Sequence, residues 1–184
     1  MISEVAMRFG GSASTYDSDA SVQREVALRL ASMLVPHAAV GASVFEVGCG
    51  TGLLSERIAS SLRPSSLVLN DLSPEMLALA RRRVLAAGCG NVSLLQADAE
   101  CCSWPVADVV VSASAVQWFA RPLSVVSRAA ESLPLGGLLC VATYGPLTFC
   151  ELRGGCPSGY PSPDDWKAEL TKRQFDILDF DSFL

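Results

Sequence analysis

The chain has 184 residues with a formal net charge of −5; half of its residues are hydrophobic and 18% are charged. This length suffices for one domain with its own core, and the composition is typical of a globular chain and excludes a disordered one. The acidic balance argues against broad nucleic-acid binding, which requires a basic face.

The sequence indicates neither a membrane span nor a secreted disulfide scaffold. Its longest apolar runs, such as residues 106–111, are too short to cross a bilayer. The start, MISEVAMRFGG, lacks the basic end and apolar centre of a signal peptide, so we expect a cytoplasmic protein. The seven cysteines form no C-x-x-C pair and His37 is the one histidine, so we predict no disulfide framework and no metal site.

The predicted elements alternate between strands and helices along most of the chain. The first 20 residues are small and polar and predict a mobile arm, and residues 21–35 carry apolar side chains at helical spacing. Strands are predicted at residues 44–47, 67–69, 92–96, 108–113, 138–144 and 175–180. Helices are predicted at residues 53–61, 74–87 (with Ser73 as N-cap and Gly88 at the end), 122–133 and 164–172. This order predicts an α/β, Rossmann-like doubly wound fold, with a mostly parallel sheet and helices on both faces.

Ligands of such a sheet lie outside the carboxyl ends of its strands, so the segments that directly follow the strands are expected to converge. These segments are Gly48 to Gly52, Asp71, Asp98, Ser114 to Trp118, and Tyr144 to Arg153.

Gly48, Gly50 and Gly52 form a G-x-G-x-G turn between a predicted strand and a predicted helix. Without side chains, the backbone can turn tightly and approach a ligand, whose polar groups can meet the free N–H groups of the helix. The dinucleotide pattern requires glycine or alanine one position later, where this chain has Leu53. An NAD site is therefore disfavoured, and a tight turn without any ligand remains an alternative.

Three carboxylates near this turn suggest which ligand it binds. Asp71 ends the second strand and can accept both hydroxyls of a ribose, although it could instead cap the next helix. Glu46 would repel a pyrophosphate and attract a cation, and S-adenosylmethionine carries a positive amino group and a sulfonium. Asp98 is placed to accept a hydrogen bond from an adenine amino group; the alternative is an ordinary turn aspartate.

The stretches EVGCGTG, LNDLSPEMLALARRR and LLQADAE together resemble the class I S-adenosylmethionine-dependent methyltransferases, over about residues 40–145. The resemblance implies S-adenosylmethionine as cofactor, S-adenosylhomocysteine as product, and no metal. The cofactor-binding residues that it implies are Glu46, Gly48, Gly50, Gly52, Asp71, Leu72, Asp98, Ala99 and Ser114.

A narrower resemblance covers both ends of the fold. The stretches RFGGSASTYDSDASVQREVALRL, SASAVQWF and ATYGPLTFCELRG are similar to the malonyl-acyl-carrier-protein O-methyltransferases of biotin synthesis. This implies methyl transfer to the free carboxylate of a malonyl group on acyl carrier protein, giving the ester that primes pimeloyl synthesis. Together with the acidic charge and the short apolar runs, we expect a monomer that binds neither nucleic acid nor membrane. The alternatives are a methyltransferase for another small free carboxylic acid, and a cofactor-binding relic without activity.

Methylation of a carboxylate needs no side chain to remove a proton, because the acceptor is already ionised near pH 7. We therefore expect no catalytic acid or base, only positioning and exclusion of water. Arg153 is the candidate to hold the malonyl carboxylate, unless it pairs on the surface with a neighbour such as Glu151. Tyr16 is expected to close over the site. Gln117 and Trp118 are expected to wall the acceptor pocket, with ordinary core packing as the alternative for Trp118.

We expect one methyltransferase domain over residues 1–184. Residues 1–35 would form a lid, residues 40–145 the cofactor-binding core, and residues 146–184 the acceptor side. The family continues beyond the sixth strand with a seventh, antiparallel strand and further helices, whereas this chain stops after FDILDFDSFL. The C-terminal strand is therefore expected to be missing, which would leave an exposed sheet edge. A basic patch for an acidic carrier protein would lie at Arg81 to Arg83 or, less favourably, at Lys167, Lys172 and Arg173; exposed solvated positions are the simpler interpretation of both.

Overall fold

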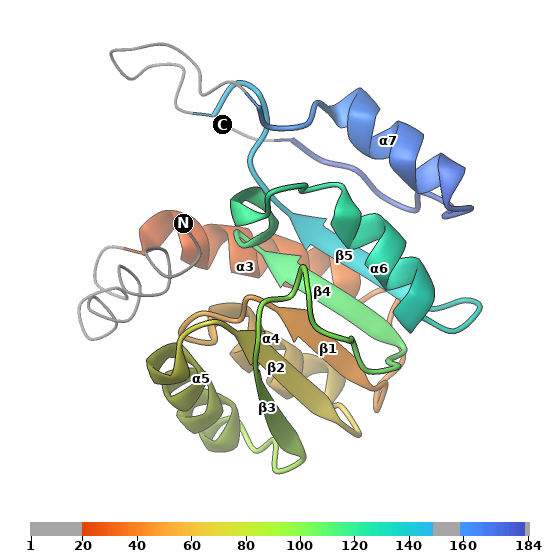
Figure 1. Cartoon of the computed structure of the whole chain (residues 1–184). Coiled ribbons are helices and arrows are strands. Elements are labelled where there is room, and N and C mark those ends of the chain that lie inside the picture. The colour runs from red at the N-terminus through yellow and green to blue at the C-terminus, as the bar shows by residue number, and fades with distance from the viewer. Residues whose placement is uncertain (1–19, 149–158, 183–184) are drawn as a thin grey trace.

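The computed structural model describes residues 20–148 and 159–182, and its centre is a five-stranded sheet between two layers of helices (Figure 1). The strand order is β3-β2-β1-β4-β5, and all four neighbouring pairs are parallel. The strands are β1 (Val44–Val47), β2 (Leu67–Asp71), β3 (Val92–Gln96), β4 (Val109–Ala113) and β5 (Leu138–Ala142). The order reverses between β1 and β4, which places the topological switch point directly above the end of β1.

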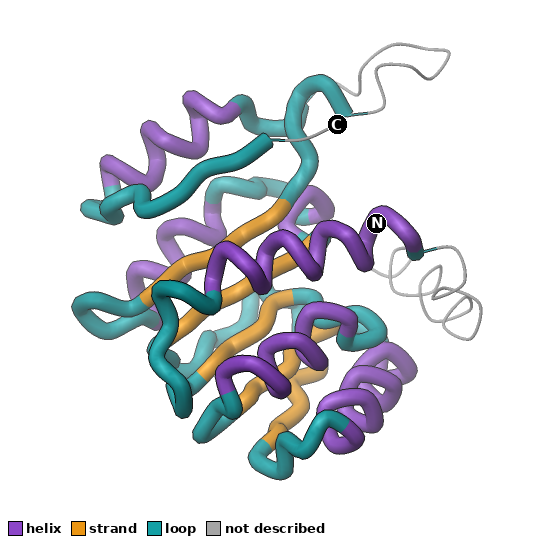
Figure 2. The backbone as a smooth tube through the Cα atoms, turned by 180° about the vertical axis from the view of Figure 1, so that it is seen from behind, coloured by secondary structure: helices purple, strands orange, loops and turns teal. Residues whose placement is uncertain are grey.

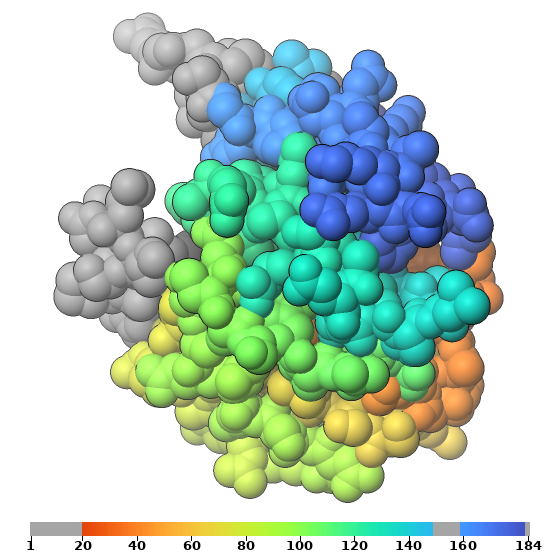
Figure 3. Space-filling view, turned by 45° about the vertical axis from the view of Figure 1, so that its right-hand side comes forward, coloured from red at the N-terminus to blue at the C-terminus, as the bar shows by residue number. Residues whose placement is uncertain are grey.

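The helices divide between the two faces of the sheet. On one face lie α3 (Ser21–Leu34), α4 (Leu53–Leu62) and α5 (Pro74–Ala86). Figure 2 views the molecule from behind, so that this face lies toward the viewer. On the other face lie α6 (Ser124–Ser132) and α7 (Pro163–Lys172), with the short 3-10 helix η1 (Val116–Trp118) before α6. Figure 3 shows this second face, where α7 (blue) lies beside α6 (teal) and α6 borders the green part of the chain.

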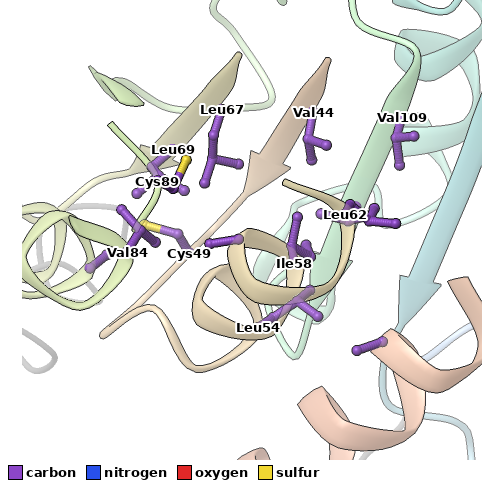
Figure 4. Packing of buried hydrophobic residues seen from close by; sticks show 14 of the residues in the cluster. Val44, Cys49, Leu54, Ile58, Leu62, Leu67, Leu69, Val84, Cys89 and Val109 are labelled. Carbon is purple, nitrogen blue, oxygen red and sulfur yellow. The ribbon is translucent and has the colours of Figure 1, made fainter. Parts of the chain in front are cut away.

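The alternation of side chains along β1 explains why both layers are needed. Val44 packs into the cluster beneath α3, α4 and α5, whereas Phe45 and Val47 point into the cluster on the opposite face. Figure 4 shows the first cluster, with Ile58 and Leu62 of α4 facing the strands. In β4 four consecutive residues are buried, as expected for a strand with both faces covered.

The predicted fold class is confirmed, and ten of the predicted strands and helices occur within a few residues of their expected bounds. Ser73 is confirmed as the N-cap of α5, because its side chain accepts a hydrogen bond from the backbone N–H of Met76 at 3.2 Å. Gly88 directly follows the C-cap residue of that helix and has a φ of +85°, as a helix-ending glycine does.

The strand predicted at residues 175–180 is wrong. Among the described residues, no backbone hydrogen bond joins this segment to β5. Side chains hold it instead: Phe175 packs with the cluster beneath α6 and α7, and Lys167 lies 4.9 Å from the centre of the Phe180 ring. Asp181 pairs with Arg29 of α3 at 3.7 Å. Phe175 packs into that cluster, whereas Ile177, Leu178 and Phe180 are exposed, so the alternation of apolar and acidic residues marks neither a paired strand nor a buried segment.

Candidate functional site

The carboxyl ends of the strands bring the predicted segments together. The N–H of Gly50 donates to Oδ2 of Asp71 at 2.9 Å, which joins the glycine turn to the end of β2. The N–H of Ser114 donates to the carbonyl of Ala142 at 2.9 Å, which joins the ends of β4 and β5. The predicted convergence is therefore present in the described part of the chain.

Glycine is present at the three positions of the turn for different structural reasons. A Cβ on Gly48 would lie 2.3 Å from the Cβ of Ala115, and a Cβ on Gly52 would lie 2.7 Å from the Cα of Ala80. A Cβ on Gly50 would meet nothing within 4 Å. All three have positive φ, from 53° to 88°. Two glycines are thus required by packing within the chain, whereas Gly50 borders open space that a ligand could occupy.

Glu46 is buried in β1, with 1% of its surface exposed. Burial raises its pKa to about 8; a hydrogen bond from Ser55 opposes this shift and the nearby charge of Asp71 adds to it. The Ser55 hydroxyl donates to Oε2 of Glu46 at 2.5 Å. The sequence alone gave no partner for Glu46, because Ser55 belongs to α4 and only folding brings its hydroxyl beneath the strand.

The carboxylate of Asp71 is fixed by the turns around it. Its Oδ1 accepts from the N–H of Ser73 at 2.9 Å, while Oδ2 accepts from Gly50. Burial raises its pKa, and the N–H groups of Ser73, Gly50 and Leu72 act in the opposite direction. Each carboxylate oxygen has two lone pairs, so Asp71 retains acceptor capacity beyond these bonds. Leu72 lies at the same edge, where its carbonyl accepts from Gln96 of β3 at 3.4 Å.

Asp98 shapes the turn that follows β3. Its Oδ1 accepts from the N–H of Glu100 at 2.9 Å, and its carbonyl accepts from the N–H groups of Cys101 and Cys102. The neighbouring Ala99 is buried, and its carbonyl accepts from the indole N–H of Trp104 at 2.9 Å. The turn role that was the alternative for Asp98 is therefore present, at the edge where an adenine contact was predicted.

The segment after β4 contains Ser114, Gln117 and Trp118. Ser114 has a φ of +55°, which is uncommon for a residue with a Cβ and concentrates at functional sites. Gln117 is buried, and its Oε1 accepts from the Thr143 hydroxyl at 3.3 Å. Trp118 is 53% exposed, which excludes the core placement that was its alternative. Tyr16 and Arg153 lie outside the described residues.

The two candidate basic patches differ in their contacts. Lys172 and Arg173 both pair with Glu169, at 3.4 and 3.2 Å. Arg83 pairs with Glu56 of α4 at 3.8 Å, while Arg81 and Arg82 are exposed on α5. Within the described ranges, no helix is both long and apolar enough to span a membrane.

Comparison with known proteins supplies the family. Residues 44–137 match the methyltransferase domain family. The malonyl-[acyl-carrier protein] O-methyltransferase of Bacteroides thetaiotaomicron is 35% identical over 178 residues, covering 95% of this chain and 67% of that protein. The enzyme of the same name from a Paenibacillus species is 34% identical, covering 76% of this chain and 54% of that protein. The chain thus spans between about half and two thirds of these two relatives.

A solved structure shows the same fold at lower identity. The N-methyltransferase NodS from Bradyrhizobium japonicum, in complex with S-adenosyl-L-homocysteine, superposes with a TM-score of 0.62 at 20% identity. The match covers 81% of this chain and 71% of NodS.

Proposed function

The chain belongs to the class I S-adenosylmethionine-dependent methyltransferases, and we propose that it methylates the free carboxylate of a malonyl group carried by acyl carrier protein. The two relatives above support this acceptor through the activity for which they are named. The proposal includes one domain, in which residues 1–35 act as a lid and residues 146–184 form the acceptor side, and a cytoplasmic monomer.

The single observation that carries the cofactor assignment is the buried carboxyl group of Glu46 in the strand that leads into the Gly48–Gly52 turn. Burial without a cation raises the pKa of Glu46 to about 8, so a positive ligand group would restore its ionised form. Gly50 leaves room for that ligand, because a side chain there would project into empty space. A pyrophosphate would meet repulsion at the same position. These residues therefore fit the amino-acid end of S-adenosylmethionine.

The remaining cofactor residues follow the same edge of the sheet. Asp71 would accept hydrogen bonds from the ribose hydroxyls through the lone pairs that its backbone contacts leave available. Asp98 and Ala99 would hold the adenine, with Leu72 and Ser114 completing the binding surface. Gly48 and Gly52 allow the turn to lie close to Ala115 and Ala80, and α4 begins directly after Gly52.

The acceptor side requires positioning and no proton transfer. When bound, S-adenosylmethionine supplies a methyl group on a positively charged sulfur. The acceptor carboxylate would take this methyl group, and the electron pair of the broken carbon–sulfur bond would stay on sulfur. Both charges are neutralised and no proton moves, so the chain needs neither a base nor an acid. Gln117 and Trp118 would wall the acceptor pocket, Arg153 would pair with the carboxylate, and Tyr16 would cover the site.

A transfer assay with S-adenosylmethionine labelled in the methyl group tests the proposal. Malonyl-acyl-carrier protein should gain label, whereas trans-aconitate and free malonate should not. Label on the free acids alone would exclude the carrier-bound acceptor. Equilibrium binding of S-adenosylhomocysteine without transfer to any acceptor would identify a relic that binds cofactor. The Glu46→Gln variant serves as the matched control, because it keeps the shape of the side chain and removes its charge.

A further inference from the structure

Glu100 connects the turn at Asp98, which is proposed to bind the cofactor, to the segment after η1, which is proposed to line the acceptor pocket. Its Oε2 accepts from the backbone N–H of Ala120 at 2.6 Å, and its Oε1 accepts from the N–H of Arg121 at 3.0 Å. Both acceptors belong to one carboxylate, so these are charge-assisted bonds and stronger than neutral ones. The two N–H groups lie just after η1, the element that contains Gln117 and Trp118.

The other end of Glu100 is tied to the Asp98 turn. Its own N–H donates to Oδ1 of Asp98 at 2.9 Å. The residue therefore spans from the carboxylate proposed to meet the adenine to the loop proposed to wall the acceptor. A change in the position of Asp98 reaches that loop through one residue and three hydrogen bonds.

The surroundings make this turn a stiff body. The connection from β3 to β4 contains no helix, and contacts from both sides hold it in place. Arg128 of α6 donates to the carbonyls of Glu100 and Cys102, and its guanidinium lies 5.1 Å from the centre of the Trp104 ring. Trp104 in turn packs edge-on against Phe45 of β1 at 5.2 Å. These contacts hold the turn together as a unit, and Trp118 beyond it is 53% exposed.

We infer that Glu100 is a positioning residue that couples cofactor binding at the Asp98 turn to the placement of Gln117 and Trp118. The inference rests on the proposed function, because the roles of both segments come from it. An adenine that binds at Asp98 shifts this stiff turn as one body, and the Glu100 carboxylate transmits the shift to Ala120 and Arg121 directly after η1. The acceptor then meets a wall that is already in place, so cofactor binding favours acceptor binding.

The test uses the full chain with 5-fluorotryptophan at its three tryptophan positions, assigned by single Trp→Phe variants. In the wild type, S-adenosylhomocysteine should shift the fluorine resonance of Trp118. In Glu100→Gln, one acceptor oxygen becomes an amide that cannot accept, so saturation with the same ligand should leave the Trp118 resonance in place. The KM for malonyl-acyl-carrier protein should rise at least about fivefold with a smaller change in kcat.

Two further variants separate positioning from folding. Glu131→Gln changes an exposed acid of α6 beside the same turn and should behave as the wild type in every measurement. Glu100→Asp keeps the charge but shortens its reach, and supplies the test if Glu100→Gln does not fold. A Trp118 shift in the Glu100 variants equal to that of the wild type would overturn the coupling. So would a wild type that methylates its acceptor without any Trp118 shift, which would leave the proposed function intact. A wild type that does not bind S-adenosylhomocysteine would overturn both.

Discussion

The hydroxyl of Ser55 donates a 2.5 Å hydrogen bond to the buried carboxyl group of Glu46 across the interface between α4 and β1. This contact stabilises the ionised form of Glu46, while burial opposes ionisation more strongly. The balance leaves a carboxyl group that changes its charge within the physiological pH range. Cofactor affinity should therefore depend on pH and on Ser55.

The pH dependence of cofactor affinity is the first prediction. With a pKa of about 8 in the ligand-free protein, Glu46 is protonated below that pH and must lose a proton to bind a cationic group. The affinity for S-adenosylhomocysteine should rise with pH by up to about tenfold per unit and level off near pH 8. Calorimetry in buffers of different ionisation enthalpy should show proton release. Glu46→Gln should bind weakly with a flat profile; an unchanged slope would contradict the assignment.

The same shift predicts how ligand-free stability varies with pH. The ordinary pKa of this carboxyl group is 4.5 and its pKa in the folded chain is about 8, so the folded chain binds the proton more tightly. The contribution of Glu46 to stability is therefore present below pH 4.5 and lost as pH rises toward 8. Chemical denaturation of Glu46→Gln should show a smaller decline over that window than the wild type. Equal declines in both proteins would show that another group titrates there.

Removal of Ser55 should weaken cofactor binding without touching the ligand. Ser55→Ala deletes the hydrogen bond that lowers the pKa of Glu46, so a smaller fraction of the carboxyl group is ionised at pH 7.5. Affinity for S-adenosylhomocysteine should fall at pH 7.5, and the pH at which affinity levels off should rise. Ser60→Ala is the control, because Ser60 lies on the same helix and its hydroxyl donates to the carbonyl of Glu56. If both variants lose affinity equally, helix stability and not Glu46 is responsible.

Gly48 and Gly50 should respond differently to alanine. Gly48→Ala forces a contact with Ala115 and a left-handed backbone on a residue with a Cβ, at a total cost of about 2 to 5 kcal/mol in unfolding free energy. Combining it with Ala115→Gly should recover the steric part. Gly50→Ala should cost only about 1 kcal/mol for the backbone, yet impair cofactor binding, since its methyl group enters the open space. Denaturant titration and calorimetry on the same samples distinguish the two effects.

The contacts of Asp108 predict a second pH effect, a loss of folding stability in acid. Its Oδ2 accepts from both the N–H and the hydroxyl of Ser43, at 2.8 and 2.7 Å, and these bonds lower its pKa. A lowered pKa contributes stability that is present above the unfolded-state value and lost as pH falls through the folded-state value. Unfolding free energy should thus decline below about pH 4, and decline less in Asp108→Asn. An identical decline in the variant would exclude this contact as the cause.

The sequence was sufficient for the order of elements, because runs such as Val109–Ala113 and helix signals such as Ser73 with Pro74 are local. It failed at residues 175–180, since apolar alternation does not by itself show that a segment pairs with a neighbouring strand. For the candidate site, strand ends located the carboxylates, but the partners Ser55 and Glu100 depend on contacts between separate elements. The sequence pattern around Trp118 could not predict its exposure either, because aromatic residues occur both in cores and at the walls of pockets.

All five strands run in the same direction, so their carboxyl ends lie at one edge of the sheet and their amino ends at the opposite edge. Changes to the chain should be tolerated better at the edge of the amino ends. The edge at the amino ends carries none of the described residues assigned to cofactor or acceptor. Its turn before β5, residues 134–137, exposes Leu135 completely and has Gly136 at a φ of +81°. Such a turn is a suitable place to open the chain for circular permutation or to insert a reporter domain. New termini at that turn would lie at the end of the sheet opposite the proposed chemistry.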